Sequence, residues 1–237
     1  MEREGTSAPR RRVCESWRGG AASGYFGALS TRKTAVFTLY DYLDSGNGYK
    51  IRLLCALVNE PYRWVEVDIL TGATRTPQFL AKNPNGRIPT LELDDGSFLA
   101  ESNAILWYLA EGSPFIPNER LSRARVLQWM FFEQYSHEPY VATPRFIKKH
   151  FPADSPRQAE LPKRLQQGRA ALAIMDAHLN KEDFFVAGRY TIADIALYAY
   201  THVADEGGLD LAPYPNVRTW IARVASQPRH VPLERRP

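Results

Sequence analysis

The chain has 237 residues, enough for one large domain or two smaller ones, and its apolar and charged fractions of 44% and 24% are ordinary for a soluble globular protein. No apolar run approaches the ~20 residues of a membrane-spanning helix, so no membrane association is expected. The net charge of +4 arises in residues 1–34, which hold seven basic and three acidic residues, whereas the rest of the chain holds 23 of each. The charge therefore gives no support for nucleic-acid binding.

Residues 1–34 lack hydrophobic periodicity and are rich in Arg, Gly, Ser and Ala, a composition that predicts a disordered basic extension. The three arginines at 10–12 are not followed by an apolar stretch, which argues against a secretory signal. Two cysteines, Cys14 and Cys55, allow neither a disulfide framework nor a Cys-rich metal site. Cys55 has the spacing of a core residue. We therefore expect a cytoplasmic protein without a metal.

Strand and helix patterns alternate from residue 35 onward. Alternating or apolar runs predict strands at 35–42, 62–69, 88–93 and 98–100, and helical spacing predicts helices at 49–58, 77–81 and 102–111. Residues 44–48 have the composition of a turn, and Asp95-Gly96 is typical of a hairpin. A crossover followed by a hairpin predicts a mixed four-stranded sheet with a thioredoxin-like topology over residues 35–112.

The second half of the chain has only helical patterns. A proline-rich segment, 113–120, is predicted to be the linker to an all-helical C-terminal domain, 121–237. Helices are expected near 121–137, 156–181, 191–205 and 215–226. Thr191 and Asp194 have the spacing of a capping box, in which a hydroxyl and a carboxylate each accept backbone N–H groups at a helix start.

Two short segments indicate a pocket for a small peptide. Ile88-Pro89 stands at a strand entrance, where an X-Pro bond can be cis and the missing N–H leaves an edge for an extended guest. Glu101-Ser102 precedes a helix whose free N–H groups and hydroxyl can hold an α-carboxylate, while the acid can pair with an ammonium group. An edge proline and an ordinary helix N-cap are the alternative interpretations of the two segments.

A third segment, residues 45–50, follows the first strand and opens the first helix. Ser45 and Asn47 would lie above the positive end of that helix, where an anion such as a thiolate is stabilised. A turn with a simple cap is the alternative. Further along, His137 and Glu138 stand side by side, and we interpret His137 as a hydrogen-bonded, partly exposed residue at a helix end rather than a metal ligand.

Between residues 36 and 227 the chain resembles the cytosolic glutathione transferase superfamily. Three motifs carry the resemblance: Asn-Pro-x-Gly-x-Ile-Pro at 83–89, Glu-Ser-x-Ala-Ile-x-x-Tyr-Leu at 101–109 and Gly-x-x-Thr-Ile-Ala-Asp at 188–194. The resemblance implies a thioredoxin-like domain that binds glutathione, an all-helical domain that lines the pocket for the second substrate, a homodimer and no metal.

The same resemblance implies roles for individual residues. Ile88 would pair with the cysteinyl backbone of glutathione beside cis-Pro89, and Glu101 and Ser102 would hold the γ-glutamyl end. The remaining positions that it implies are Arg87 and Lys82 for the glycine carboxylate, and Phe132, Tyr140 and Arg145 for the second-substrate pocket.

Ser45 and Asn47 are the catalytic candidates. Ser45 matches the serine-type classes, whereas Ser45-x-Asn47-Gly-x-Lys50 resembles the bacterial nu class, in which the asparagine contacts the sulfur. The main functional hypothesis is a transferase that joins the glutathione thiolate to a small hydrophobic electrophile. A glutathione-dependent disulfide reductase or peroxidase and a non-catalytic binding protein of the same fold are the alternatives. No cysteine stands at this position, so a mixed disulfide with the protein's own thiol is not expected.

Overall fold

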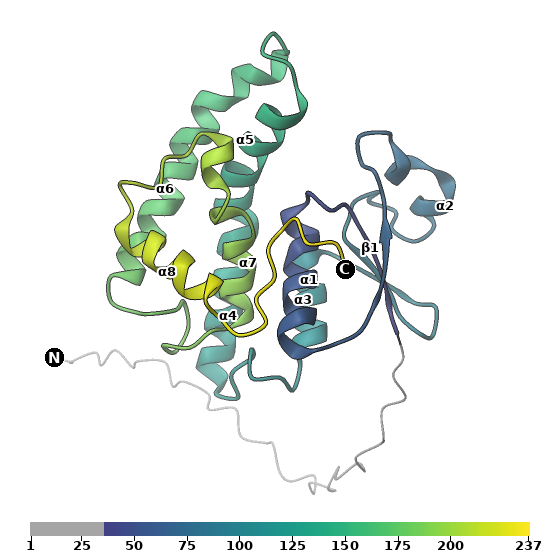
Figure 1. Ribbon diagram of the computed structural model, residues 1–237, viewed down its shortest axis with the longest axis horizontal. Helices are drawn as coiled ribbons and strands as arrows, with labels where there is room; N and C mark the ends of the chain where they lie inside the picture. The colour runs from purple at the N-terminus through teal and green to yellow at the C-terminus, as the bar shows by residue number, and fades with distance from the viewer. Residues whose placement is uncertain (1–35) are drawn as a thin grey trace, which may run out of the picture. The chain divides into compact units, whose positions relative to one another are not determined.

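The computed structural model describes residues 36–237, and the predicted basic extension lies outside these residues. Its first half contains a four-stranded sheet in the order β2-β1-β3-β4 (Figure 1). β1 pairs with β2 in parallel and with β3 in antiparallel, and β4 pairs with β3 in antiparallel. The predicted mixed sheet is therefore confirmed. The strands are β1 (Thr38–Asp41), β2 (Arg63–Glu66), β3 (Thr90–Glu92) and β4 (Phe98–Ala100).

Three helices belong to this half: α1 (Gly46–Val58), α2 (Pro77–Leu80) and α3 (Ser102–Ala110). In Figure 1, α1 and α3 lie between the sheet and the helices of the second half, whereas α2 lies on the side away from them. Because this arrangement presents the start of α1 and the start of α3 to the second half of the chain, residues at both helix ends can face a common space.

The helix α1 begins three residues earlier than predicted. The Ser45 hydroxyl accepts a hydrogen bond from the N–H of Gly48 at 3.4 Å, so the expected turn is the first turn of the helix. Gly48 has to be glycine, because a Cβ at this position would lie 1.5 Å from a carboxylate oxygen of Asp41. The residues that looked like a turn are therefore small because the helix start is packed tightly against β1.

The second half of the described chain is helical. It contains α4 (Arg120–Phe132), a π-helical segment (Glu133–His137), α5 (Glu138–His150), α6 (Leu161–Leu179), α7 (Ile192–Thr201) and α8 (Pro215–Ala225), with short 3₁₀ turns at Pro156–Glu160 and Ala204–Gly207. Our sequence analysis missed α5. This helix contains two prolines: Pro139 lies in the first turn, where its missing N–H costs nothing, and Pro144 is accommodated within the helix.

The hydrophobic core runs through both halves of the chain. Every residue of α7 is buried, and this helix packs against α1 from the first half. The predicted capping box at its start is confirmed, with the N–H of Thr191 donating to Asp194 at 2.9 Å. Cys55 is also in this core, as predicted, and its burial raises the pKa of its thiol. The linker between two domains at residues 113–120 stays a prediction.

The C-terminal residues return to the first half. The hydroxyl of Tyr49 donates to the carbonyl of Val231 at 2.7 Å, and the buried guanidinium of Arg52 donates to the carbonyl of Leu233 at 2.8 Å. Figure 1 shows this segment running back along α1. The end of the chain is thus part of the contact between the two halves.

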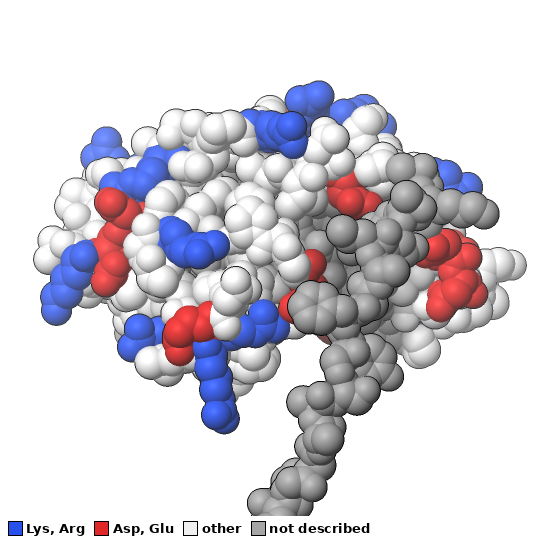
Figure 2. All heavy atoms as spheres, turned by 90° about the horizontal axis from the view of Figure 1, so that it is seen from below, with Lys and Arg blue, Asp and Glu red and all other residues white. Residues whose placement is uncertain are grey.

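Charged groups do not form a single-sign patch on the face shown in Figure 2, where basic and acidic residues are interspersed with uncharged surface. Within residues 36–237, no helix is both long enough and apolar enough to cross a membrane. The same residues contain no cluster of three or more His, Cys, Asp or Glu side chains that could hold a metal ion.

Candidate functional site

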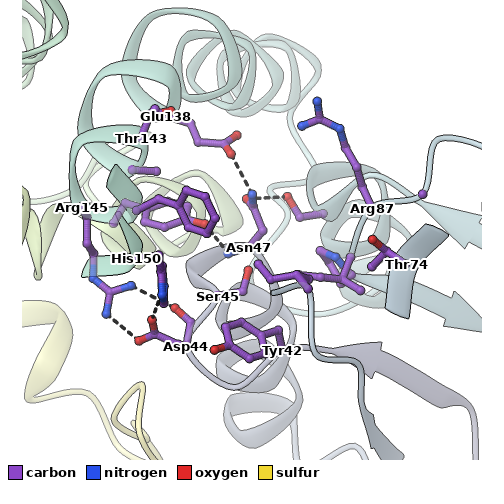
Figure 3. Close-up of a pocket in the computed structure, with 18 of the residues that line it drawn as sticks. Tyr42, Asp44, Ser45, Asn47, Thr74, Arg87, Glu138, Thr143, Arg145 and His150 are labelled. Carbon is purple, nitrogen blue, oxygen red and sulfur yellow. Dashed lines mark hydrogen bonds and ion pairs between the residues drawn. The ribbon is translucent and has the colours of Figure 1, made fainter. Parts of the chain in front are cut away.

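A cavity of about 640 Å³ lies between the two halves of the described chain. One wall consists of the loop that enters α1, the segment before β3 and the start of α3, and the other consists of the π-helical segment and α5 (Figure 3). Eight residues that the sequence analysis singled out line it: Ser45, Asn47, Arg87, Ile88, Pro89, Glu101, Ser102 and Arg145.

Asn47 is fixed by contacts from both halves. Its side-chain nitrogen donates to Glu138 Oε1 at 2.8 Å, and its side-chain oxygen accepts from the hydroxyl of Ser102 at 3.1 Å. Its backbone N–H donates to the hydroxyl of Tyr200 at 3.2 Å. An amide nitrogen carries two protons, and one of them remains for a ligand in the cavity. Asn47 therefore offers a pre-oriented donor beside Ser45 at the start of α1.

The segment before β3 presents a free stretch of backbone to the cavity. The Ile88–Pro89 peptide bond is cis, as the sequence analysis allowed. The Asn83 side chain supports this turn, because its nitrogen donates to the carbonyl of Arg87 at 2.8 Å. Among the hydrogen bonds of the described residues, none uses the backbone N–H or carbonyl of Ile88. These two groups can therefore pair with an extended ligand.

The start of α3 differs in one respect from the expected N-cap. Glu101 occupies the cap position, with a φ of 67° that non-glycine residues rarely adopt, and its side chain is exposed to the cavity. Ser102 is the first helical residue and is buried, and its hydroxyl bonds to Asn47 instead of capping the helix. The first backbone N–H groups of α3 are thus left for an anionic group of a ligand.

The opposite wall of the cavity is polar, and its arginines are paired with carboxylates. Arg145 donates to Asp44 at 2.7 Å and to Glu206 at 2.7 Å, which anchors the residue preceding Ser45 to α5 (Figure 3). Burial alone would raise the pKa of Asp44, but hydrogen bonds from Lys149 and Arg145 hold it below its usual value. His150, Arg157 and Arg164 complete this wall. The cavity therefore combines hydrogen-bond donors at the start of α1 with a polar wall of paired arginines.

Comparison with known proteins agrees with this geometry. The family model for the glutathione S-transferase N-terminal domain matches residues 35–111, and the model for the C-terminal domain matches residues 129–228. The chain belongs to the glutathione S-transferase family. The thioredoxin-like N-terminal fold and the helical C-terminal fold predicted from the sequence are those of this family.

Several relatives extend the comparison. A crystal structure of a glutathione S-transferase from Pseudomonas fluorescens Pf-5 is 54% identical, covers 84% of this chain and 99% of that chain, and has a TM-score of 0.81. The disulfide-bond oxidoreductase YfcG of Escherichia coli K12 is 32% identical over 79% of this chain and 89% of its own. A glutathione transferase family member from P. fluorescens Pf-5 with two glutathione molecules bound is 26% identical, with a TM-score of 0.73, over 84% and 92% of the two chains.

Three residues that the family resemblance singled out do not line the cavity of this transferase-family chain. Lys82 lies over the rings of Tyr40 and Phe98 and 3.8 Å from Glu92. Phe132 packs edge-on against Trp129 in the helical core. Tyr140 is on α5, where its carbonyl faces Gly168 of α6. None of the three is among the residues that line the cavity.

The sequence analysis gave no role in the site to two cavity residues, Glu138 and Tyr200. Each bonds to Asn47, yet they lie 91 and 153 residues further along the chain. The adjacent His137 is fully buried, not partly exposed as predicted. Since the hydroxyl of Thr201 donates to the carbonyl of Leu197, it accepts from His137 Nε2, which leaves Nδ1 without a partner among the described residues.

This buried histidine predicts a pH effect on stability. Burial, with a smaller contribution from Lys50, lowers the pKa of His137 from 6.5 to about 3. Below pH 6.5 the unfolded chain gains a proton that the folded chain does not, so His137 stabilises the fold fully above pH 6.5 and less as the pH falls. The wild type should lose about 1.4 kcal/mol per pH unit relative to His137→Gln in this range. Urea unfolding of both proteins between pH 7 and 4.5 measures this difference, and parallel pH profiles would contradict it.

Proposed function

We propose that this protein binds glutathione in the cavity and uses the glutathione thiolate as a nucleophile. The observation that carries the proposal is the Asn47 amide, held by Glu138 and Ser102 at the start of α1 with one donor free. A sulfur placed there would receive that hydrogen bond and the favourable field of the helix end. Ser45 would provide a second donor, because its hydroxyl oxygen accepts from Gly48 and its proton remains available.

The rest of the tripeptide fits the other cavity groups. The free backbone groups of Ile88 would pair with the cysteinyl unit. The γ-glutamyl carboxylate would lie at the first N–H groups of α3, with its ammonium beside Glu101. Arg87, which is exposed on the same wall, would attract the glycine carboxylate. Lys82 is not among the residues that line the cavity, and its role toward the glycine carboxylate stays a prediction.

The reaction that we favour is the reduction of a disulfide that contains glutathione. The bound thiolate would attack one sulfur of the disulfide, form a new S–S bond and expel the other sulfur as a thiolate. Because one sulfur of the disulfide already belongs to glutathione, attack on that sulfur gives oxidised glutathione and one released thiolate, so each turnover consumes one reduced glutathione. The wall with His150, Arg157 and Arg164 supplies hydrogen-bond donors for the polar groups of a disulfide that contains glutathione. The similarity to a disulfide oxidoreductase and to a protein with two bound glutathione molecules supports the same choice.

Conjugation to a small hydrophobic electrophile is the second candidate. Ala142, Phe146 and Tyr200 provide an apolar area in the same cavity, next to the proposed sulfur position. Both reactions need the same thiolate and differ only in the atom attacked, sulfur or carbon. A cytoplasmic setting, in which glutathione is kept reduced, suits either of them.

The two reactions can be separated by turnover. With reduced glutathione as donor, we expect kcat/KM for a glutathione mixed disulfide to exceed that for a chloronitroaromatic electrophile at least about tenfold, a difference of about 1.4 kcal/mol in transition-state stabilisation. Arg157→Gln should raise the KM for the charged disulfide and leave the KM for a neutral disulfide unchanged. Faster turnover of the electrophile would favour the transferase, and no turnover of either substrate despite binding would favour a non-catalytic role.

We also propose that the protein forms a homodimer. Large side chains on α3, α4 and the adjoining π-helical segment are exposed, with Tyr108 at 52%, Phe131 at 68% and Tyr135 at 82%. Exposed aromatic residues are typical of the cores of protein interfaces. Light scattering of the intact protein and of Phe131→Asp would test the assembly.

A further inference from the structure

Lys50 is a buried cation that is linked through Ser102 to Asn47, the proposed donor to the sulfur. It belongs to the second turn of α1 and is fully inaccessible to solvent. Its ammonium group donates to Glu133 at 2.9 Å and to the hydroxyl of Ser102 at 3.2 Å. A buried ammonium group is rare in proteins and needs close partners. Lys50 has two such partners, and one of them also holds Asn47.

The π-helical segment supplies the acid that pairs with Lys50. The backbone N–H of Glu138 bonds to the carbonyl of Glu133, a five-residue spacing that brings both side chains to one face. Glu133 then accepts from Lys50 and from the side chain of Asn103 at 2.9 Å, while Glu138 accepts from Asn47. A regular α-helix would separate the two carboxylates around its axis. The π-helical segment therefore places one carboxylate against Asn47 and the other against the buried cation.

The direction of the hydrogen bonds follows from Lys50. An ammonium group can only donate, so the oxygen of Ser102 accepts from it and the Ser102 proton must point elsewhere. That proton goes to the side-chain oxygen of Asn47. The amide nitrogen of Asn47 is thereby turned toward Glu138 and the cavity. If the amide were reversed, its oxygen would face the carboxylate of Glu138, which is repulsive.

We propose that Lys50 is a positioning residue that, through Ser102, orients the Asn47 amide so that its free N–H points at the glutathione sulfur. This inference rests on the proposed function and adds a residue that does not line the cavity. The charged and titratable groups around the relay are Lys50, Glu133, Glu138, His137 and Tyr200, whose hydroxyl accepts from the N–H of Asn47, and burial keeps His137 neutral. Since Lys50 and Glu133 compensate each other, the main effect of Lys50 is on orientation, not on the net charge of the site.

The test removes the cation without leaving a buried charge unpaired. In Lys50→Met/Glu133→Gln, Ser102 loses its fixed donor, so its hydroxyl can turn away from the Asn47 oxygen and the Asn47 amide is then held by Glu138 alone. We expect the ionisation midpoint of bound glutathione, followed by the ultraviolet absorbance of the thiolate, to rise by about one pH unit, a tenfold loss of thiolate well below the midpoint. Lys50→Gln/Glu133→Gln, which keeps a neutral donor at position 50, should restore part of the loss. Asp176→Ala, which weakens the distant start of α8, should not change the midpoint.

A double-mutant cycle tests whether the effect of Lys50 on Asn47 passes through Ser102. If Lys50 acts through Ser102, adding Lys50→Met/Glu133→Gln to Ser102→Ala will produce no further rise in the midpoint. An unchanged midpoint in a folded Lys50→Met/Glu133→Gln protein, or additive shifts in the cycle, would overturn the inference while leaving the proposed function intact. Failure of the wild type to lower the midpoint of bound glutathione would overturn both.

Discussion

Replacing Ser45 and Asn47 together with alanine is expected to reduce glutathione-dependent turnover at pH 7 by about two orders of magnitude. A free thiol with a pKa of ~8.5 is only a few per cent ionised at that pH. Lowering the pKa by about two units takes roughly 2.7 kcal/mol, which one charge-assisted hydrogen bond and a helix end can supply. The double variant removes both side-chain donors and leaves only the helix end.

The ultraviolet band of the bound thiolate gives the direct readout, because it should disappear at neutral pH together with the activity. Losing the Ser45 cap will also destabilise α1 by about 1 kcal/mol. Thr76→Ala is the matched control: Thr76 caps α2 by accepting from Phe79, so this variant loses a helix cap without changing the cavity. The single variants would show whether Ser45 or Asn47 contributes more. Normal turnover in the double variant would place the chemistry elsewhere.

Asp194→Ala should give a large loss of stability without touching the cavity. The carboxylate is fully buried and accepts from the indole of Trp220 at 3.0 Å and from the N–H groups of Phe185 and Thr191 at 3.1 and 2.9 Å. Alanine leaves these donors without their acceptor in the core. Since each unsatisfied buried donor costs about 1–3 kcal/mol, we expect a loss of about 3 kcal/mol or more in the free energy of unfolding.

For a domain of this size, that loss corresponds to a decrease of about 6–12 °C in Tm, which calorimetry would detect. Asp210→Ala is a suitable control, because Asp210 is exposed and accepts only from the N–H of Ala212, two residues away. Its Tm should change little. Equal effects of the two substitutions would show that the buried network at the start of α7 is not the source of the stability.

Most of the fold could be predicted because its signals are local. The alternation in β1, the Asp-Gly hairpin before β4 and the capping box of α7 each depend on residues that are close in sequence. The exception is α5, for which the sequence analysis predicted no separate helix. The π-helical segment before it had no sequence signal, because a single extra residue in a turn does not alter the hydrophobic pattern visibly.

The sequence predicts site residues whose position is set by a local turn. It does not predict hydrogen bonds between side chains that are far apart in the sequence. Ile88, Pro89, Glu101 and Ser102 line the cavity because the turns that hold them are encoded next to them. The contacts of Asn47 with Glu138 and Tyr200 depend on how the two halves pack. The family resemblance alone suggested roles for Lys82, Phe132 and Tyr140. These three residues do not line the cavity in this chain.

A crystal structure of the protein soaked with reduced glutathione is the most direct test of this account. We predict that the sulfur will lie within hydrogen-bonding distance of the Asn47 side-chain nitrogen, with the cysteinyl backbone paired to Ile88 and the γ-glutamyl carboxylate at the start of α3. A cavity that stays empty at saturating glutathione, or a sulfur that points away from α1, would contradict it.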